Sequence, residues 1–202
     1  MVASKIPGIE AIAFDIDGTL YPAWKLTLRA VPFFICHIRF MNAFRKVRRI
    51  LHEYSSSDPD KVLPDFFNEQ SELLAAQLSI STQEAGDFLD REIYKGWKKI
   101  FLRIRPYPFA KEAIIRLKEA GIKIGILSDF PPEQKGSVWG MLPLCDAALD
   151  SEAFGALKPS RIPFLKLAEA LNTPCERILY VGNSKAYDVA GASSVGMKTA
   201  YI

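Results

Sequence analysis

Short apolar runs alternate with amphipathic segments at the start of the chain and over its second half. Apolar residues dominate residues 9–14, 122–127 and 178–181, and runs of this length bounded by turn residues are typical of strands buried in a sheet. Residues 109–120 instead carry apolar positions at helical spacing, and Gly121 follows as a stop signal. The alternation predicts a parallel sheet whose strands are joined by right-handed helical crossovers.

Weaker patterns complete this part of the chain. Ser160 is expected to cap a helix that begins with Arg161-Ile162-Pro163. The remaining expected elements are a helix over residues 132–142, a short strand over 147–149, the helix from Ser160 to about residue 171, a helix over 186–193 and a last strand over 198–202.

Residues 21 to about 104 interrupt the alternation and look wholly helical. Apolar positions recur at helical spacing over residues 28–54, a loop follows, and residues 64–78 read as the next helix. Ser81-Thr82-Gln83-Glu84 is a capping-box pattern that opens another helix running through Trp97. The sequence therefore predicts an α/β core formed by residues 1–20 and 105–202, with a separate helical domain over residues 21–104.

Two features of this helical insert allow more than one interpretation. Its first long segment has a basic face that could steer an anionic substrate, although the acidic residues that follow favour a merely solvated face. The run Val31-Pro32-Phe33-Phe34-Ile35-Cys36 could touch a membrane surface, but a place in the core of the insert or in a pocket wall is favoured. The basic residues are Arg39, Arg45, Lys46, Arg48 and Arg49.

Composition narrows the class of protein. The chain has 202 residues, 49% hydrophobic and 24% charged, which is ordinary for a globular protein of one or two domains. A net charge of +3 gives no footprint for general nucleic-acid binding. The three cysteines show no metal-ligand spacing, and neither a secretory signal nor a membrane span is recognisable. The expected location is the cytoplasm, and the oligomeric state stays open.

Two carboxylates mark the end of the first strand. Asp15 and Asp17 are one residue apart, so on an extended backbone they share a face, and Gly18 then allows a sharp turn. Like charges so close together are costly unless they are neutralised. A divalent cation that prefers carboxylate oxygens is the obvious neutraliser.

Further polar residues follow the other expected strands. Ser128 and Asp129 end the second long strand, Lys158 precedes a proline, and residues 182–188 contain both Asn183 and Asp188. In open α/β sheets the ligand site lies beyond the carboxyl ends of the strands, so these groups are expected to meet there. Taken singly, each residue has an ordinary alternative role as a turn residue, a helix cap or a solvated side chain.

Asp15-Ile16-Asp17-Gly18-Thr19, Ser128, Lys158 and the segment Gly182 to Asp188 match, in order, the four motifs of the haloacid dehalogenase-like hydrolases. The chain resembles this superfamily over its whole length, and most members are phosphatases with an aspartyl nucleophile. The resemblance implies a Rossmann-like sheet with the first motif at its centre and a helical cap, here residues 21–104, that closes over the site. One position departs from the family pattern, because Asn183 stands where an aspartate is usual.

The resemblance also implies roles for these residues. Asp15 would attack phosphorus, and Asp17 would serve as general acid and base, which argues against dehalogenation because dehalogenases of the family lack an acid there. Asn183 would supply a neutral oxygen to Mg²⁺, directly or through water, or would only orient a water molecule while Asp188 does more of the binding; either way the metal should bind more weakly without its binding being abolished. The expected catalytic residues are Asp15, Asp17, Ser128 and Lys158; the expected substrate-binding residues are Ser128, Asp129 and Lys158; the expected metal ligands are Asp15, Asp17, Asn183 and Asp188.

The sequence thus predicts a Mg²⁺-dependent phosphatase that hydrolyses a small phosphorylated metabolite through an aspartyl-phosphate. Three alternatives stay open. A phosphotransferase or sugar-phosphate mutase would have the same motifs, a binding module could have lost turnover through Asn183, and the apolar face of the insert could serve a structural interaction. Neither nucleic acid nor membrane is expected as a partner.

Overall fold

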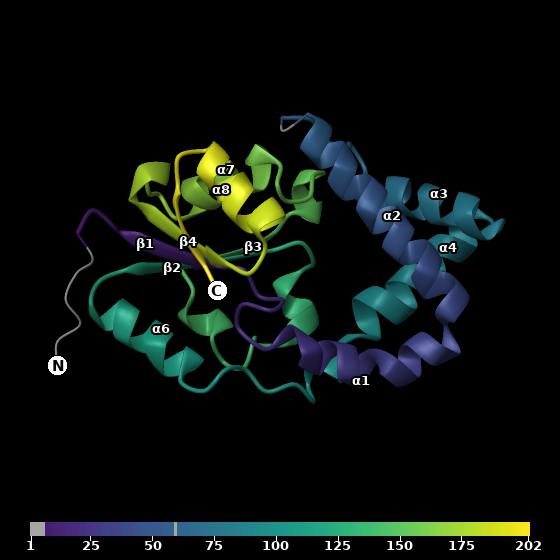
Figure 1. Cartoon of the computed structure of the whole chain (residues 1–202), viewed down its shortest axis with the longest axis horizontal. Coiled ribbons are helices and arrows are strands. Elements are labelled where there is room, and N and C mark those ends of the chain that lie inside the picture. The colour runs from purple at the N-terminus through teal and green to yellow at the C-terminus, as the bar shows by residue number, and fades with distance from the viewer. Residues whose placement is uncertain (1–6, 59) are drawn as a thin grey trace.

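The computed structural model describes residues 7–58 and 60–202, and its centre is a five-stranded parallel sheet (Figure 1). The strand order is β3-β2-β1-β4-β5, so the first strand of the chain lies in the middle. The strands are β1 (Ala11–Phe14), β2 (Lys123–Ser128), β3 (Ala147–Asp150), β4 (Ile178–Gly182) and β5 (Lys198–Tyr201). The predicted parallel sheet with the first motif at its centre is confirmed.

The register of the sheet brings the ends of three strands together. Phe14, the last residue of β1, pairs with Ile126 on one side and with Val181 on the other. The pairing continues one residue further, because the backbone N–H of Asp15 donates to the carbonyl of Val181 over 3.0 Å. Residues that follow β1, β2 and β4 therefore emerge at the same edge of the sheet.

Helices cover both faces of the sheet, as Figure 1 shows with α6 below it and α7 and α8 above it. These helices are α6 (Ala110–Glu119), α7 (Arg161–Ala170) and α8 (Ala190–Ser194). Large side chains such as Ile12 face α6, whereas Ala11 and Ala13 face α7. A Cβ on Gly125 would lie about 3.1 Å from both Ala13 and a leucine of α7, so small residues let that helix pack closely.

The insert forms a second, all-helical layer beside the sheet, on the right of Figure 1. It has its own hydrophobic cluster, which includes Met41, Phe44 and Leu74. Two hydrogen bonds join it to the loop before Lys158: Leu63 N–H donates to Gly155 and Leu157 N–H to Ser55. Its helices are α1 (Ala23–Cys36), α2 (Ile38–Ser57), α3 (Phe66–Leu78), α4 (Thr82–Phe88) and α5 (Lys98–Phe101), with a π-helical turn over Leu89–Lys95.

Local signals account for most of the boundaries in the insert. The expected capping box at Ser81 and Glu84 is present and starts α4, and the expected helix start near Pro64 falls at Asp65, which caps α3. Residues 28–54 belong to two helices, because the chain leaves helical geometry at His37. The domain limits at residues 20 and 105 stay a prediction. Among the described residues, no helix is both long and apolar enough to cross a membrane.

The predicted helix over residues 132–142 is wrong. Only the short 3₁₀ turns Pro132–Lys135 and Leu142–Leu144 form there. Between them Gly136, Val138, Trp139 and Gly140 all have positive φ, which no α-helix accepts. The indole of Trp139 donates to the carbonyl of Ile104 over 2.7 Å, so tertiary contacts override the local helical pattern.

Candidate active site

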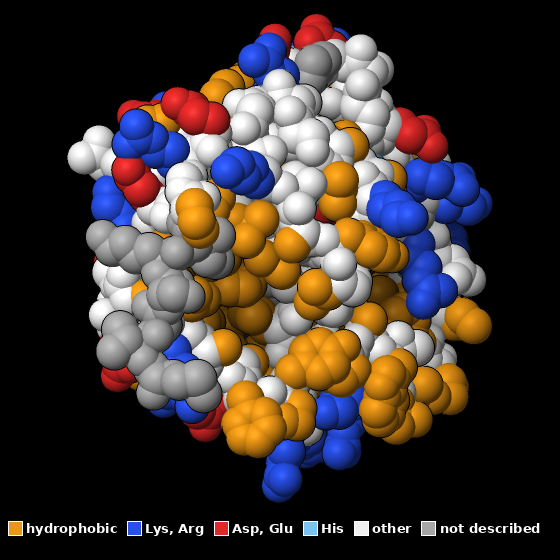
Figure 2. All heavy atoms as spheres, turned by 60° about the vertical axis from the view of Figure 1, so that its left-hand side comes forward, with side chains coloured by type: hydrophobic (Ala, Val, Ile, Leu, Met, Phe, Trp, Pro, Cys, Tyr) orange, Lys and Arg blue, Asp and Glu red, His pale blue; other side chains and the backbone are white. Residues whose placement is uncertain are grey.

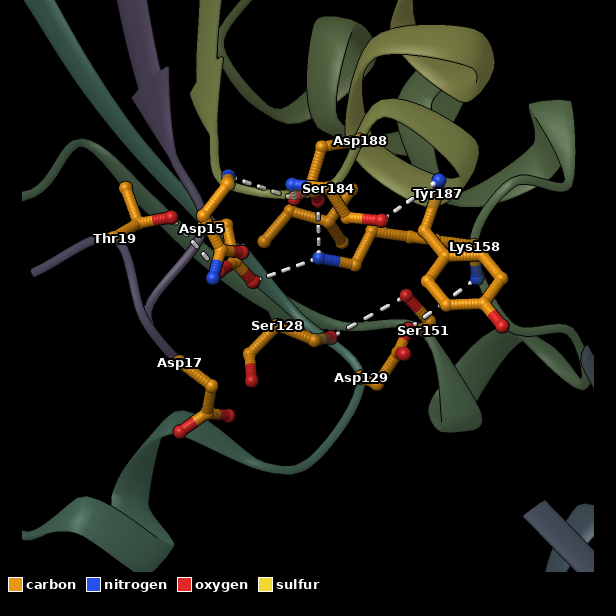
Figure 3. Close-up of polar contacts among 12 residues, drawn as sticks. Asp15, Asp17, Thr19, Ser128, Asp129, Ser151, Lys158, Ser184, Tyr187 and Asp188 are labelled. Carbon is orange, nitrogen blue, oxygen red and sulfur yellow. Dashed lines mark hydrogen bonds and ion pairs between the residues drawn. The ribbon is translucent and has the colours of Figure 1, made fainter. Parts of the chain in front are cut away.

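A buried lysine joins two carboxylates at the edge of the sheet where β1 and β4 end (Figure 3). Lys158 Nζ donates to Asp15 Oδ1 and to Asp188 Oδ1, each over 2.7 Å. Each of the three side chains is no more than 6% exposed. The structure thus brings together the residues that the first, third and fourth motifs were expected to supply.

The loop after β1 holds Asp15 in place. Thr19 Oγ donates to Asp15 Oδ2 over 3.0 Å, so both oxygens of this carboxylate have partners. Gly18 has a φ of 91°, which favours glycine, and an added Cβ would overlap the side chain of Asn183. Asn183 therefore lies directly against the loop that carries Asp15 and Asp17, as a fourth-motif ligand should.

A short π-helical turn, Lys185–Val189, positions Asp188. Its Oδ2 accepts from the backbone N–H groups of Asn183 and Ser184, over 3.1 and 3.0 Å. A Cβ on Gly182 would lie 2.4 Å from the Cβ of Asp188, so only glycine permits this close approach. The Gly182 to Asp188 motif thus works as one unit that presents a fixed carboxylate to Lys158.

Burial and neighbouring charges shift the pKa values of Asp15 and Lys158. Burial, together with the charges of Asp188 and Asp17, raises the pKa of Asp15 to about 6, although Lys158 opposes the shift. Burial would lower the pKa of Lys158, but Asp15 and the carboxylates near it raise it well above its usual range. Lys158 therefore stays charged. The raised pKa of Asp15 shows that this one lysine does not fully compensate the nearby carboxylates, so a bound cation would be favourable there.

Asp17 lies on the same loop but points away from Lys158 in Figure 3. Tyr21 donates to its Oδ1 over 2.5 Å, and Lys135 Nζ is 3.1 Å from its Oδ2. Lys135 is fully buried and also donates to Ser128 Oγ over 3.4 Å. Ser128 itself is buried behind the cavity rather than in its lining.

Tyr21 and Lys135 were not among the expected site residues. Tyr21 follows the first motif by two residues, and its isolated pairing with Asp17 folds it back. Lys135 falls in the segment that was expected to be helical, where a lysine carries no signal of its own. Burial and the charge of Asp17 raise the pKa of Tyr21 far above its usual range, so its phenol always donates.

Asp129, next to Ser128 of the second motif, contacts both Lys158 of the third motif and the helical insert. Its Oδ1 accepts from Lys158 N–H over 3.3 Å, and its Oδ2 is 3.5 Å from Nε2 of His52 on α2. His52 Nδ1 donates to the carbonyl of Lys158 over 2.7 Å, and the ring stacks on Tyr187. An exposed turn role for Asp129 is wrong, because its side chain is only 18% exposed. His52, which was not among the expected site residues, lines the cavity.

A cavity of about 540 Å³ opens over these groups, between the sheet edge and the insert. The motif residues form one wall and α2 forms the other with Met41, Phe44 and three arginines. The expectation of a merely solvated basic face is therefore corrected. Arg48 is mostly buried and pairs with Glu152, while Arg45 and Arg49 are exposed at the cavity; Arg39 instead donates to the carbonyl of Leu78.

The expected metal ligands Asp15, Asp17, Asn183 and Asp188 all line the cavity. Their possible donors are the side-chain oxygens of Asp15, Asp188 and Asn183, and the family resemblance implies that Asp17 would contribute its backbone carbonyl. Within residues 7–58 and 60–202 no group of three or more His, Cys, Asp and Glu side chains is placed to hold a metal. The donor set depends instead on a carbonyl and an amide, and hard oxygen donors beside an excess of carboxylate fit Mg²⁺.

The chain belongs to the haloacid dehalogenase-like hydrolases, whose family model matches residues 9–196. The predicted family is confirmed. A glyceraldehyde 3-phosphate phosphatase of Pyrococcus abyssi (strain GE5 / Orsay) is 29% identical and covers 96% of this chain, which covers 81% of that protein. An (S)-2-haloacid dehalogenase of Pseudomonas sp. (strain YL) is 25% identical, with coverages of 96% and 82%.

The fold is also that of a solved structure. The L-2-haloacid dehalogenase of Xanthobacter autotrophicus superposes with a TM-score of 0.65, at 21% identity, over 96% of this chain and 77% of its own. At this identity the likeness shows the fold alone, and it confirms the predicted Rossmann-like core. The relatives named as phosphatases support the predicted phosphatase type.

Proposed function

We propose that this hydrolase is a Mg²⁺-dependent phosphatase of a small phosphorylated metabolite, acting through an aspartyl-phosphate on Asp15. The observation that carries the proposal is the pair of bonds from Lys158 to Asp15 and Asp188, at the wall of a cavity that also holds Asp17. The cytoplasmic location stays a prediction from the sequence.

Asp17 favours phosphatase over dehalogenase chemistry. A phosphate ester expels an alkoxide that needs a proton, whereas a halide leaves without one. Asp17 is the carboxyl group that can supply this proton, and Tyr21 and Lys135 hold it at the cavity. The resemblance of the fold to dehalogenases therefore does not extend to the chemistry that the residues support.

The first half-reaction breaks the bond between phosphorus and the ester oxygen. An oxygen of Asp15 attacks phosphorus in line, Asp17 donates a proton to the departing oxygen, and Lys158 offsets the negative charge of the phosphoryl oxygens. Ser128 was expected to orient that group, but it is buried outside the cavity lining, so its effect would pass through Lys135, which donates to its Oγ. Bound Mg²⁺ would neutralise further phosphoryl charge from the side of Asp188 and Asn183.

The second half-reaction releases phosphate. Asp17, now ionised, takes a proton from a water molecule that attacks phosphorus, and the bond to Asp15 breaks to restore its carboxylate. The helical insert over the cavity would exclude water during the first step and contact the leaving group. A cavity of about 540 Å³ fits a small metabolite, and the relative named for glyceraldehyde 3-phosphate supports a substrate of that size.

The test is hydrolysis of p-nitrophenyl phosphate with and without Mg²⁺, with Asp15→Asn as the control. Metal-dependent release that disappears in the variant supports the enzyme and its nucleophile. Acid-quenched protein labelled by a ³²P substrate only when Asp15 is present would identify the aspartyl-phosphate. Transfer of phosphate to an added hydroxyl compound in preference to water would instead make the chain a phosphotransferase.

A further inference from the structure

The helix α1 has an apolar face that is largely exposed. Trp24, Leu28, Val31 and Ile35 follow one another at intervals of four, three and four residues, which places them on one side of a helix. They are 63%, 61%, 43% and 69% exposed. The opposite side of α1 is the one that packs, because Ala30 is buried and Phe33 and Phe34 contact the core of the insert.

A second exposed apolar segment continues this face. Leu102, Tyr107 and Phe109 precede α6 and are 71%, 41% and 77% exposed. Tyr107 N–H donates to the carbonyl of Leu20 over 2.9 Å, and Lys25 Nζ donates to that of Arg105 over 3.3 Å, so this segment runs beside the start of α1. We call these seven side chains the α1 face.

The two chain segments that form the α1 face carry only positive charge, and Glu112 in the first turn of α6 is the first acidic residue after them. No aspartate or glutamate occurs over residues 18–52 or 93–111, although the whole chain has 23 such residues and a net charge of only +3. Both α1 and the segment before α6 lie at the lower end of the molecule in Figure 1, and Figure 2 shows hydrophobic side chains gathered there beside Lys and Arg. The exposed basic residues are Arg29, Lys98, Lys99, Arg103 and Arg105.

We propose that the α1 face docks on the surface of an anionic lipid bilayer, with α1 lying in the plane of the headgroups. An amphipathic helix binds such a surface through its buried apolar area and through attraction of Lys and Arg to anionic lipids. Trp24 would sit at the interface, where an indole has both an apolar body and a polar N–H. A second copy of the chain is a poorer occupant, because its α1 face would bring the same positive charges opposite these.

This inference does not depend on the reaction and revises the expectation that the chain has no membrane partner. Val31 and Ile35 of the apolar run noted in the sequence are exposed on the α1 face, whereas Phe34 of that run lines the cavity. One helix therefore has both a lipid-facing side and a side that reaches the site. Peripheral docking would hold the cavity close to the bilayer without any membrane-spanning segment.

The experiment measures co-sedimentation of the full chain with phosphatidylcholine vesicles that contain or lack about 30% phosphatidylglycerol. We expect binding only to the anionic vesicles, with loss of binding in about 0.5 M NaCl. Fluorescence provides a second readout, because Trp24 is the exposed one of the three tryptophans and should shift to shorter wavelength on docking. Leu28→Gln with Ile35→Gln should weaken partitioning by at least about tenfold.

Matched substitutions separate docking from a general effect on folding. Leu165→Gln removes an exposed leucine from α7, on the opposite side of the molecule, and should leave partitioning unchanged. Lys99→Gln with Arg103→Gln should reduce binding to anionic vesicles, whereas Lys166→Gln on α7 should not. All of these variants should keep the hydrolytic rate of the parent, since none of the residues lines the cavity.

Three results would overturn the proposal. Equal binding to neutral and anionic vesicles would contradict the proposed attraction between the basic residues and anionic lipids. Equal effects of the α1 and α7 substitutions would show that the α1 face is not the docking surface. A lipid-free dimer that Leu28→Gln dissociates, seen by light scattering, would make the α1 face a contact between copies instead.

Discussion

The ammonium group of Lys135 lies 3.1 Å from Oδ2 of Asp17, and the lysine side chain is completely buried. Its Nζ also lies 5.0 Å from the ring centre of Phe101, so the hydrophobic surroundings fix its position. A buried ammonium group needs a carboxylate partner, because an uncompensated charge in the interior is costly. Lys135 and Tyr21 therefore hold the Asp17 carboxylate in place, and in the proposed reaction Lys135 would act as a positioning residue for this acid.

Lys135→Met should impair hydrolysis in a manner that depends on the leaving group. An alkoxide leaves only with a proton from a positioned acid, whereas p-nitrophenolate leaves well without one. For glycerol phosphate we expect kcat to fall by about 100-fold, and for p-nitrophenyl phosphate by about tenfold or less. Steady-state kinetics with both substrates measures the difference.

The control for this substitution is Lys185→Met. Lys185 is exposed on the turn that carries Asp188, and its ammonium group lies over the ring of Tyr201, so both rates should stay near those of the parent. A loss in Lys135→Met that is the same for both leaving groups would mean that the lysine only stabilises the fold.

Asn183→Asp should tighten the binding of Mg²⁺. The new carboxylate would lie against Gly18, beside the loop of Asp15 and Asp17, and would give the cation a charged ligand in place of a neutral one. We expect the Mg²⁺ concentration for half-maximal activity to fall by about tenfold, and calorimetric titration of the protein to show the same change. Asn172→Asp makes the same chemical change at an exposed position and should have no effect.

If the parent is inactive and Asn183→Asp is active, the metal site of the parent is disabled. If both are inactive, the insert rejects the substrate used. An unchanged Mg²⁺ requirement would mean that position 183 orients water rather than the cation. In that case Asp188 and the carbonyl of Asp17 would be the ligands that matter.

The sheet and the motif residues could be predicted because their signals are local. Short apolar runs set the strands, and residues directly after β1, β2 and β4 must meet where parallel strands end together. Asp15 follows directly from that geometry, and the segment after β4 leads to Asp188, whereas Lys158 lies in the loop before α7 and was expected from the family resemblance. Lys135 could not be predicted, because its partner is 118 positions away and its own segment reads as a helix that Gly136 and Gly140 break.

The sequence also could not predict that α2 forms the second wall of the cavity. A helix shows which residues share a face but not which face meets a distant sheet edge, so His52 and Arg45 looked like solvated side chains. Only the packing of α2 over the loop before Lys158 turns that face inward, through contacts such as His52 to the Lys158 carbonyl. In the proposed function that wall would contact the leaving group of the substrate, so the motifs alone do not identify the substrate.

Arg45 and Arg49 should speed the capture of an anionic substrate. Arg45 lies 4.5 Å from the ring centre of Phe34 and both arginines line the cavity, so their charges add to the attraction of a phosphate ester. Arg45→Gln with Arg49→Gln should lower kcat/KM by about tenfold at low salt, leave kcat nearly unchanged, and flatten the dependence of kcat/KM on ionic strength. Lys46→Gln, between them on α2 but outside the cavity lining, should do none of this.

Asp15→Asn and Asp129→Asn should change stability in opposite directions when divalent cations are removed by a chelator. The pKa of Asp15 is raised to about 6, mainly by burial, so the native state favours its neutral form. The stability that this provides is present at low pH and is lost as pH rises through about 6. At pH 8 the neutral Asp15→Asn should therefore be more stable than the parent by about 2 to 3 kcal/mol.

The pKa of Asp129 is shifted in the opposite direction from that of Asp15. Burial raises the pKa of its carboxyl, but Lys158, His52 and Arg48 together lower it below its usual value, so the native state favours the ionised form. This stabilisation is present at neutral pH and is lost as the carboxyl is protonated in acid. Asp129→Asn should thus be less stable than the parent at pH 8, and urea denaturation of both variants at pH 5 and pH 8 measures the contrast. If both substitutions destabilised the protein at pH 8, the ionised carboxylate of Asp15 would be stabilising the fold through its ion pair with Lys158. Its ionised form would then not be the unfavourable one in the native state without a bound cation.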